Sequence, residues 1–187
     1  MILPELVGRH STLRALLPSD APSIALHADD PEVWRNLFDG FPRPYTLADA
    51  EAWCGDGHRQ PAVGHVWAID VQGQAVGCIG LRPDGGWLRC NAEVGYWIGR
   101  AFWRRGICGE ALAMVRDWAF VALPQLTRLY APIFAWNEGS MAVARHAGFV
   151  AEGRFPASAI KGGQLIDRVQ YGCVRPGVIG GMPTLTS

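Results

Sequence analysis

Between residues 66 and 98 the apolar residues come in short runs and alternations, a pattern typical of half-buried strands. Three segments share this pattern, at 66–71, 75–81 and 92–98, and the pair Gln72-Gly73 between the first two is a tight-turn signal. The second connection, at 81–90, contains Pro83 and Asp84 followed by two glycines. We therefore predict a three-stranded antiparallel meander in the middle of the chain.

The spacing changes after residue 98, where apolar side chains recur every three to four residues and Glu110 and Asp117 fall on the opposite face. This spacing predicts an amphipathic helix that ends before Pro124, with apolar positions Ile107, Ala111, Val115, Trp118 and Ala122. A strand at 128–133 and a helix at 138–146, closed by Gly148, are expected next. Strands at 149–154 and 167–174 complete the regular structure.

The N-terminal part combines short apolar stretches with helix-start signals. A strand near Thr12 leads to a helix at 21–28, and the proline- and aromatic-rich stretch 31–45 predicts a short helix and a shaped loop. Thr46 and Asp49 approximate a capping box for a helix that reaches about His58. The order β-α-α-β-β-β-α-β-α-β-β predicts an α/β fold in which helices flank a mixed, mostly antiparallel sheet.

Length and composition predict one domain over residues 1–176 and a flexible tail at 177–187, which holds three glycines and little to bury. The chain has 17 Lys and Arg against 17 Asp and Glu, so it offers no basic field for nucleic acid. Its five cysteines are widely spaced with no C-x-x-C, which predicts reduced thiols, no metal site and a cytoplasmic location. Neither a secretion signal nor a membrane span is expected.

The most informative segment is the strand ending at Ile98 and the turn Trp103-Arg104-Arg105-Gly106-Ile107-Cys108-Gly109-Glu110-Ala111, which opens a helix. The first backbone N–H groups of a helix lack internal partners and attract anions, so two glycines and two arginines there suit a pyrophosphate. The segment alone equally fits a capped helix with two solvated arginines. It contains neither the P-loop nor the dinucleotide-binding glycine pattern, which argues against a nucleotide-binding oxidoreductase.

Tyr96-Trp97-Ile98 followed by residues 103–111 resembles the acetyl-CoA signature of the GNAT acetyltransferase superfamily. The resemblance is to the branch of bacterial enzymes that acetylate ribosomal-protein N-termini (Rim-type), and it covers about residues 10–175. Further matches are Pro44-Tyr45-Thr46, Asn137-x-x-Ser140, Gly148-Phe149 and Glu152-Gly153. The chain departs from the usual pattern at Trp103, where Gln or Arg is usual but Trp is common in this branch, and at Cys108, where Gly or Ala is usual. It also has Ala144 where many members carry a tyrosine that protonates the thiolate.

The resemblance implies an N-acetyltransferase that moves the acetyl group of acetyl-CoA to a primary amine by direct attack in a ternary complex, without a metal. It assigns acetyl-CoA to Trp97, Ile98, Arg104, Arg105, Gly106, Ile107, Cys108, Gly109, Asn137 and Ser140. The acceptor is then a small-molecule or peptide amine, and a homodimer is compatible with this reading. The alternative, motivated by Cys108 and Ala144, is a non-catalytic acetyl-CoA-binding or sensing module.

Two catalytic roles and an acceptor pocket follow from the same resemblance. Glu93, on the strand expected to border the acceptor, is the candidate general base, against the alternative of a solvated strand carboxylate. Ser140 is the candidate acid, although it equally suits a local backbone partner at a helix start. Trp34, Tyr45 and Trp53 are expected to line the acceptor pocket, with core packing as the alternative.

Overall fold

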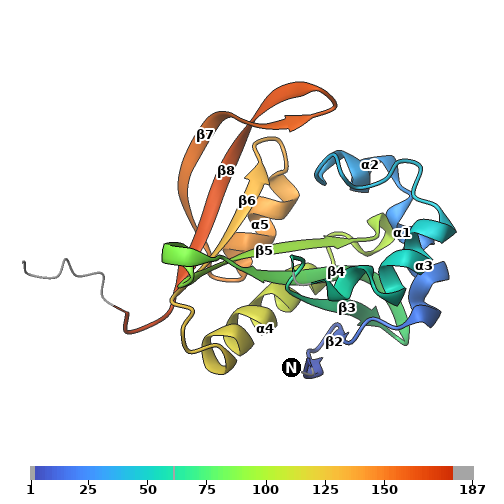
Figure 1. The fold of residues 1–187 in the computed structure, drawn as a ribbon, viewed down its shortest axis with the longest axis horizontal. Coiled ribbons are helices and arrows are strands. Elements are labelled where there is room, and N and C mark those ends of the chain that lie inside the picture. The colour runs from blue at the N-terminus through green and yellow to red at the C-terminus, as the bar shows by residue number, and fades with distance from the viewer. Residues whose placement is uncertain (1–2, 61, 179–187) are drawn as a thin grey trace, which may run out of the picture.

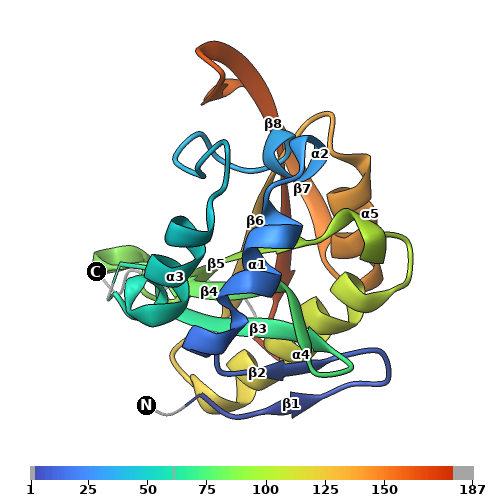
Figure 2. The ribbon, with the colours of Figure 1, turned by 90° about the vertical axis from the view of Figure 1, so that its right-hand side faces the viewer.

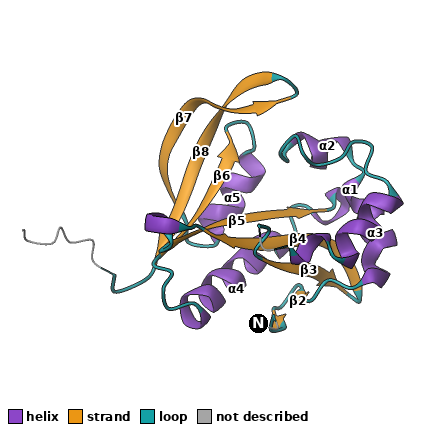
Figure 3. Cartoon of the chain, in the orientation of Figure 1, coloured by secondary structure: helices purple, strands orange, loops and turns teal. Residues whose placement is uncertain are grey.

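The computed structural model describes residues 3–60 and 62–178, and within them eight strands form one sheet (Figures 1 and 3). The strands are β1 (Leu6–Val7), β2 (Thr12–Arg14), β3 (His65–Val71), β4 (Gln74–Pro83), β5 (Asn91–Ile98), β6 (Arg128–Phe134), β7 (Val150–Lys161) and β8 (Gln164–Val174). The helices are α1 (Ala21–Ala28), α2 (Pro31–Arg35), α3 (Leu47–Gly55), α4 (Ile107–Ala122) and α5 (Glu138–His146). The strand order is β1-β2-β3-β4-β5-β6-β8-β7, and β5–β6 is the parallel pair in it.

The central meander forms as the sequence predicts. Gln72 and Gly73 both have positive φ, 55° and 83°, as a two-residue hairpin turn between twisted strands requires. The carboxylate of Asp70 accepts a hydrogen bond from Gly73 N at 2.7 Å and so fixes the turn. From there β3 pairs with β4, and β4 with β5, along almost their whole lengths.

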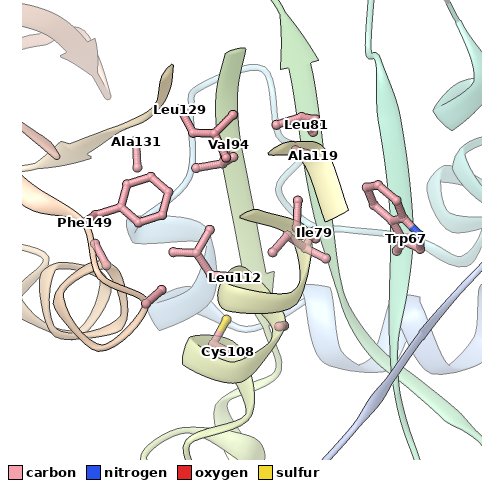
Figure 4. Packing of buried hydrophobic residues seen from close by; sticks show 14 of the residues in the cluster. Trp67, Ile79, Leu81, Val94, Cys108, Leu112, Ala119, Leu129, Ala131 and Phe149 are labelled. Carbon is pink, nitrogen blue, oxygen red and sulfur yellow. The ribbon is translucent and has the colours of Figure 1, made fainter. Parts of the chain in front are cut away.

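Two hydrophobic cores cover the two faces of the sheet. The larger core lies under α4 and α5, and Figure 4 shows Leu112 of α4 among side chains from β3, β4, β5 and β6. The smaller core joins α1 and α3 to the opposite face, over β3 and β4 (Figure 2). Because helices cover both faces of the sheet here, side chains on both faces of β3 and β4 are buried. This explains why both strands are nearly continuous apolar runs in the sequence.

The sheet splits between its two middle strands. β5 and β6 pair only from Asn91 to Glu93, opposite Arg128 to Tyr130, and then separate. Beyond that point β5 remains paired with β4 as far as Ile98, and β6 remains paired with β8 as far as Phe134. The two halves of the sheet therefore diverge at an angle, which Figure 1 shows as the opening between β5 and β6.

The structure confirms the predicted α/β class and adds elements that the hydrophobic pattern does not reveal. β1, a two-residue strand, is one such element, whereas the short helix predicted within 31–45 is present as α2. The last two strands are longer than predicted, because β7 runs to Lys161 and β8 begins at Gln164. The α3 helix ends at Gly55 and is followed by a short 3-10 turn to Arg59. From residue 179 on, the predicted tail lies outside the described residues.

An ion cluster ties the start of the chain to the sheet. Arg14 on β2 donates two hydrogen bonds to Asp20, both at 2.8 Å, and one to Asp70 at 2.7 Å. Burial opposes ionisation of Asp20, but hydrogen bonds from Arg14 and from Leu17 N outweigh it and lower the pKa of this carboxyl. Because the folded-state pKa lies below that of the unfolded chain, the ionised Asp20 stabilises the fold.

We expect Asp20→Asn to lower the free energy of unfolding by about 1.5–3 kcal/mol at pH 7, the usual value of a hydrogen bond to a charged group. The contribution is complete above the unfolded-state pKa of about 3.9 and disappears as the pH falls through the lower folded-state pKa. Urea unfolding of both proteins at pH 7, 5 and 3 checks this. A difference between the two proteins that did not shrink at pH 3 would contradict it.

Candidate active site

A cavity of about 1000 Å³ occupies the split between β5 and β6. It runs from the N-terminus of α4, past both strands, to the segment after α2 and the outer part of the β7–β8 hairpin. The predicted donor-site and catalytic residues all line it: Glu93, Trp97, Ile98, Arg104, Arg105, Gly106, Ile107, Cys108, Gly109, Asn137 and Ser140. Residues from three separate parts of the chain thus meet in one space.

The start of α4 offers free backbone N–H groups to the cavity. Gly106 is the N-cap residue with φ of 76°, and no side chain caps this end. Arg104 also has positive φ, at 61°, so the turn holds a conformation that only glycine adopts cheaply. Glu110, the acidic residue of the first turn, binds Arg9 N and His10 N of the β1–β2 turn at 2.6 and 2.9 Å. The turn therefore presents arginines and amides to the cavity.

Gly109 and Cys108 also take part in the packing beneath the α4 turn. A Cβ on Gly109 would lie 2.7 Å from Cδ2 of His146, so the absence of a side chain allows α4 and α5 to approach each other. Cys108 belongs to the larger core, and burial raises the pKa of its thiol to about 12. These packing contacts involve the Cα of Gly109 and the side chain of Cys108, and both residues also line the cavity.

Asn137, Ser140 and Tyr96 form one hydrogen-bonded group that lines the cavity at the start of α5. Asn137 Oδ1 accepts from Ser140 N at 3.0 Å and caps α5, which leaves the amide NH₂ of Asn137 to donate elsewhere. Ser140 Oγ donates to Tyr96 OH at 3.0 Å, and Tyr96 OH donates to Ser140 O at 3.1 Å. Burial raises the pKa of Tyr96, so the phenol holds its proton.

Sequence reasoning did not assign a role to Tyr96, although the alternation along β5 places it on the same face as Val94 and Ile98. Ser140 does not bond its local backbone through Oγ, as the alternative interpretation would require, but reaches across to Tyr96. Ala144, at the position of the missing tyrosine, is fully buried in the larger core. The hydroxyl groups near this end of the cavity therefore come from Tyr96 and Ser140.

Glu93 lies at the point where the β5–β6 ladder ends. It is directly opposite Arg82 on β4, and Arg82 Nη2 donates to Glu93 Oε2 at 2.5 Å. The carboxylate is partly shielded, with a side-chain exposure of 29%. Within the described residues its other oxygen, Oε1, makes no hydrogen bond, so it can accept one from a ligand in the cavity.

Trp34, Tyr45 and Trp53 do not line the cavity. Tyr45 and Trp53 pack in or against the smaller core, where Tyr45 stacks on Phe41 at 4.8 Å between ring centroids. Trp34 lies under Lys161, whose Nζ is 3.4 Å from the ring centroid. The predicted acceptor-pocket role of these three residues is corrected to packing; the aromatic residues that do line the cavity include Phe38, Phe102, Phe134 and Trp136.

The segment after α2 bridges the outer end of the cavity. Trp136 Nε1 donates to Asn36 Oδ1 at 3.2 Å, and Gly162 N donates to both carboxylate oxygens of Asp39 at 3.0 and 3.1 Å. Lys161 adds an ion pair with Asp39 at 3.4 Å, although burial lowers the pKa of this lysine. These contacts join the segment to the β6–α5 connection and to the hairpin tip.

Metal-binding clusters, disulfides and membrane-spanning helices are absent from the described residues. No group of three or more His, Cys, Asp or Glu side chains there is arranged to hold a metal ion, and all five cysteines are unpaired. Among the same residues, every helix is too short or too polar to cross a lipid bilayer.

Comparison with known proteins identifies the class to which this fold and cavity belong. Residues 10–150 match the family described as "Acetyltransferase (GNAT) domain". The chain belongs to this family, whose members are acyltransferases that use acetyl-CoA.

One relative in sequence is the Bacillus subtilis protein named "Putative ribosomal N-acetyltransferase YdaF". The two chains are 30% identical over 175 residues, which cover 90% of this chain and 93% of the relative. Among solved structures, Mycobacterium smegmatis RimJ with a CoA disulfide aligns with a TM-score of 0.77 and 24% identity, over 88% of this chain and 81% of that chain. The microcin C7 self-immunity acetyltransferase MccE, with acetyl-CoA and AMP, gives 0.77 and 19% identity, over 90% and 94%. The structural likeness supports the fold.

We expect Gly106→Ala to weaken acetyl-CoA binding by about tenfold, comparable to the loss of one charge-assisted hydrogen bond, because it strains the turn that carries the free amides. Gly86→Ala is the matched control, since Gly86 also has positive φ, at 60°, but lies outside the cavity with open space around it. Each change should cost roughly 1–2 kcal/mol of stability. Isothermal titration with acetyl-CoA checks the difference; equal weakening in both variants would contradict it.

Proposed function

We propose that this protein transfers the acetyl group of acetyl-CoA to a primary amine by direct attack in a ternary complex. The observation that carries the proposal is the continuity of the cavity, which joins the amide-rich α4 turn to Glu93 through the split in the sheet. A donor at one end and an acceptor at the other would meet beside β5. Residues 1–176 would act as one acetyltransferase domain, without a metal.

The donor would be held along β5 and at the start of α4. The amides of residues 104–109 would bind the pyrophosphate, with charge added by Arg104 and Arg105. The bare edge of β5 beyond Glu93 would pair with the pantetheine arm as another strand does. Asn137 would donate its free amide hydrogens to the pantetheine or the thioester carbonyl.

The amine would lose its proton to Glu93, directly or through one water. An α-amino group has a pKa of about 7.7–8.0 and a lysine amine about 10.4, so modest help suffices for an N-terminus. The amine nitrogen then attacks the thioester carbon, and the carbon–sulfur bond breaks to release the thiolate of CoA. Oε1 of Glu93 could accept the amine proton without first losing a hydrogen bond to another described residue.

The thiolate would take its proton from Ser140, whose Oγ would take a proton from water in the same step, so that Ser140 stays neutral. The proton that Glu93 removed from the amine would return to solvent and balance the cycle. Ser140 Oγ–H now points to Tyr96 OH, and a rotation about the serine side chain redirects it toward the sulfur. The phenol of Tyr96 would support Ser140 and stay protonated through the cycle, which agrees with its raised pKa. This pair would perform the role of the tyrosine that Ala144 replaces.

The acceptor would be a protein N-terminus or a small amine resembling an amino acid. The name of the B. subtilis relative points to ribosomal protein, and the net charge of zero gives no support to a polyamine acceptor. Five unpaired cysteines fit the reducing conditions of the cytoplasm, where we place the reaction.

We expect the wild-type protein to release free CoA thiol with at least one α-amine, and Glu93→Gln to lower kcat by roughly 10² with acetyl-CoA affinity unchanged. Gln keeps the shape and the contact with Arg82 but cannot take a proton. The loss should shrink as the pH approaches the pKa of the amine. Thiol release across pH 6.5–9.5 checks this, and bound acetyl-CoA without turnover of any amine would favour the non-catalytic module.

We expect Ser140→Ala to reduce kcat by about 10²-fold, because the thiolate must then take its proton directly from solvent. Tyr96→Phe should cause a smaller loss and leave acetyl-CoA affinity within about threefold, since it removes only the support of Ser140. Single-turnover thiol release separates the two. A larger defect in Tyr96→Phe than in Ser140→Ala would transfer the acid role to Tyr96.

A further inference from the structure

Arg168 on β8 lies where two cavities meet. Beside the main cavity is a second one of about 370 Å³, and the residues that line both are Glu93 on β5, Pro132 on β6 and Arg168 on β8. The carboxylate proposed to take the amine proton and the Arg168 guanidinium therefore face the same opening. An acceptor bound next to Glu93 would come within reach of Arg168.

Of the three arginines around this opening, Arg82 and Arg128 form ion pairs with carboxylates, and Arg168 forms none within the described residues. Arg82 pairs with Glu93, and Arg128 pairs with Glu152 on β7. Asp84 accepts a hydrogen bond from Tyr130 OH at 3.0 Å. Arg168 is half-buried, and in the described parts of the chain its recorded side-chain partner is a neutral hydroxyl and not a carboxylate. A partly desolvated guanidinium favours an anion in the space in front of it.

An irregularity in β7 lies beside Arg168. The β7–β8 register shifts between Phe155 and Ala159, and Ala157 within the bulge has a φ of 48°. Asp167 stabilises this strained backbone by accepting from Ala157 N at 2.9 Å and twice from Arg154. Bulges of this kind reorient side chains next to functional sites.

The bulge also supplies the group that orients the guanidinium. Ser158 Oγ donates to Phe155 O at 2.7 Å and accepts from Arg168 Nε at 3.1 Å. Nε is engaged, and the two terminal nitrogens of Arg168 have no hydrogen-bond partner among residues 3–60 and 62–178. They remain for a ligand, in the fork geometry that matches a carboxylate. Three features therefore converge on one cation: its position beside Glu93, its lack of a counter-ion and its fixed orientation.

We infer that the amine acceptor carries a carboxylate that binds Arg168 while the amine lies at Glu93. This inference rests on the proposed function and narrows its acceptor to anionic amines. The carboxylate has two possible sources, the α-carboxylate of a free amino acid or the acidic side chain of the second residue of a peptide. Both present the same anion, and the experiment separates them.

The test compares matched acceptors that differ in one charge: alanine with alaninamide, and Ser-Asp-Ala-Ala amide with Ser-Asn-Ala-Ala amide. In one of these pairs the wild type should prefer the acceptor that carries the carboxylate. Arg168→Gln should raise the KM for that acceptor about 10- to 100-fold and leave the KM for its neutral partner nearly unchanged. The two acceptors of a pair differ in amine pKa, but this difference is the same for the wild type and the variant. It therefore cancels when the KM ratio of the two acceptors is compared between the two proteins. Ser158→Ala should give a smaller rise of the same kind, and Arg89→Gln, an exposed arginine outside both cavities, should give none.

Binding measured without turnover keeps this inference separate from the proposed reaction. The same acceptors are titrated into protein saturated with CoA, and the wild type should bind the carboxylate member of one pair about 10- to 100-fold more tightly, a preference that Arg168→Gln removes. Equal binding of charged and neutral members in both pairs, or equal losses for both members in Arg168→Gln, would overturn the inference. A retained preference without any thiol release would support the role of Arg168 and overturn the transfer reaction.

Discussion

The short parallel ladder between β5 and β6 is the constraint on which the rest of the structure depends. Three residue pairs hold the two strands together, and beyond Glu93 and Tyr130 each strand keeps a partner on one side only. A bare strand edge inside a protein carries backbone groups that need hydrogen bonds. The split therefore creates both a space and a set of unsatisfied partners, which suits an extended ligand better than a compact one.

Side chains replace the missing backbone ladder across the split. Tyr96 and Ser140 connect β5 to α5 by two hydrogen bonds, and Leu112 of α4 packs among residues from both halves of the sheet (Figure 4). The close approach of α4 and α5, which Gly109 and His146 allow, supports both halves from one face. The opening is thus maintained by a packed core and not by loose loops.

The sequence alone predicts the features that depend on local periodicity. The meander, α4 and α5 have clear spacing of apolar residues, and the order of these elements indicates the fold class. The outer parts of β7 and β8 escape prediction because the bulge at 156–158 interrupts the alternation and both faces are largely exposed. β1 is too short to leave a pattern at all.

The sequence predicts the parts of the site that are continuous segments. It does not predict the contacts that folding makes between residues distant in the sequence. The turn at 104–109 is one continuous segment, and the physics of a helix N-terminus points to it directly. Tyr96 and Ser140 are 44 residues apart in the sequence, so only the fold reveals their contact. Tyr45 and Trp53 show the opposite error, because hydrophobicity does not distinguish an aromatic residue of the core from one that lines a cavity.

The contacts that bridge the outer end of the cavity also bear on when the site becomes complete during folding. Asp39 and Gly162 are 123 residues apart, and Asn36 and Trp136 are 100 apart. Contacts of such long range close large loops and form after the local hairpins and helices. On the ribosome, the N-terminal segment must wait for nearly the whole chain to emerge before it meets the hairpin tip. The turn at 104–109 can fold earlier, so the bridged outer end of the cavity is the last part to take shape.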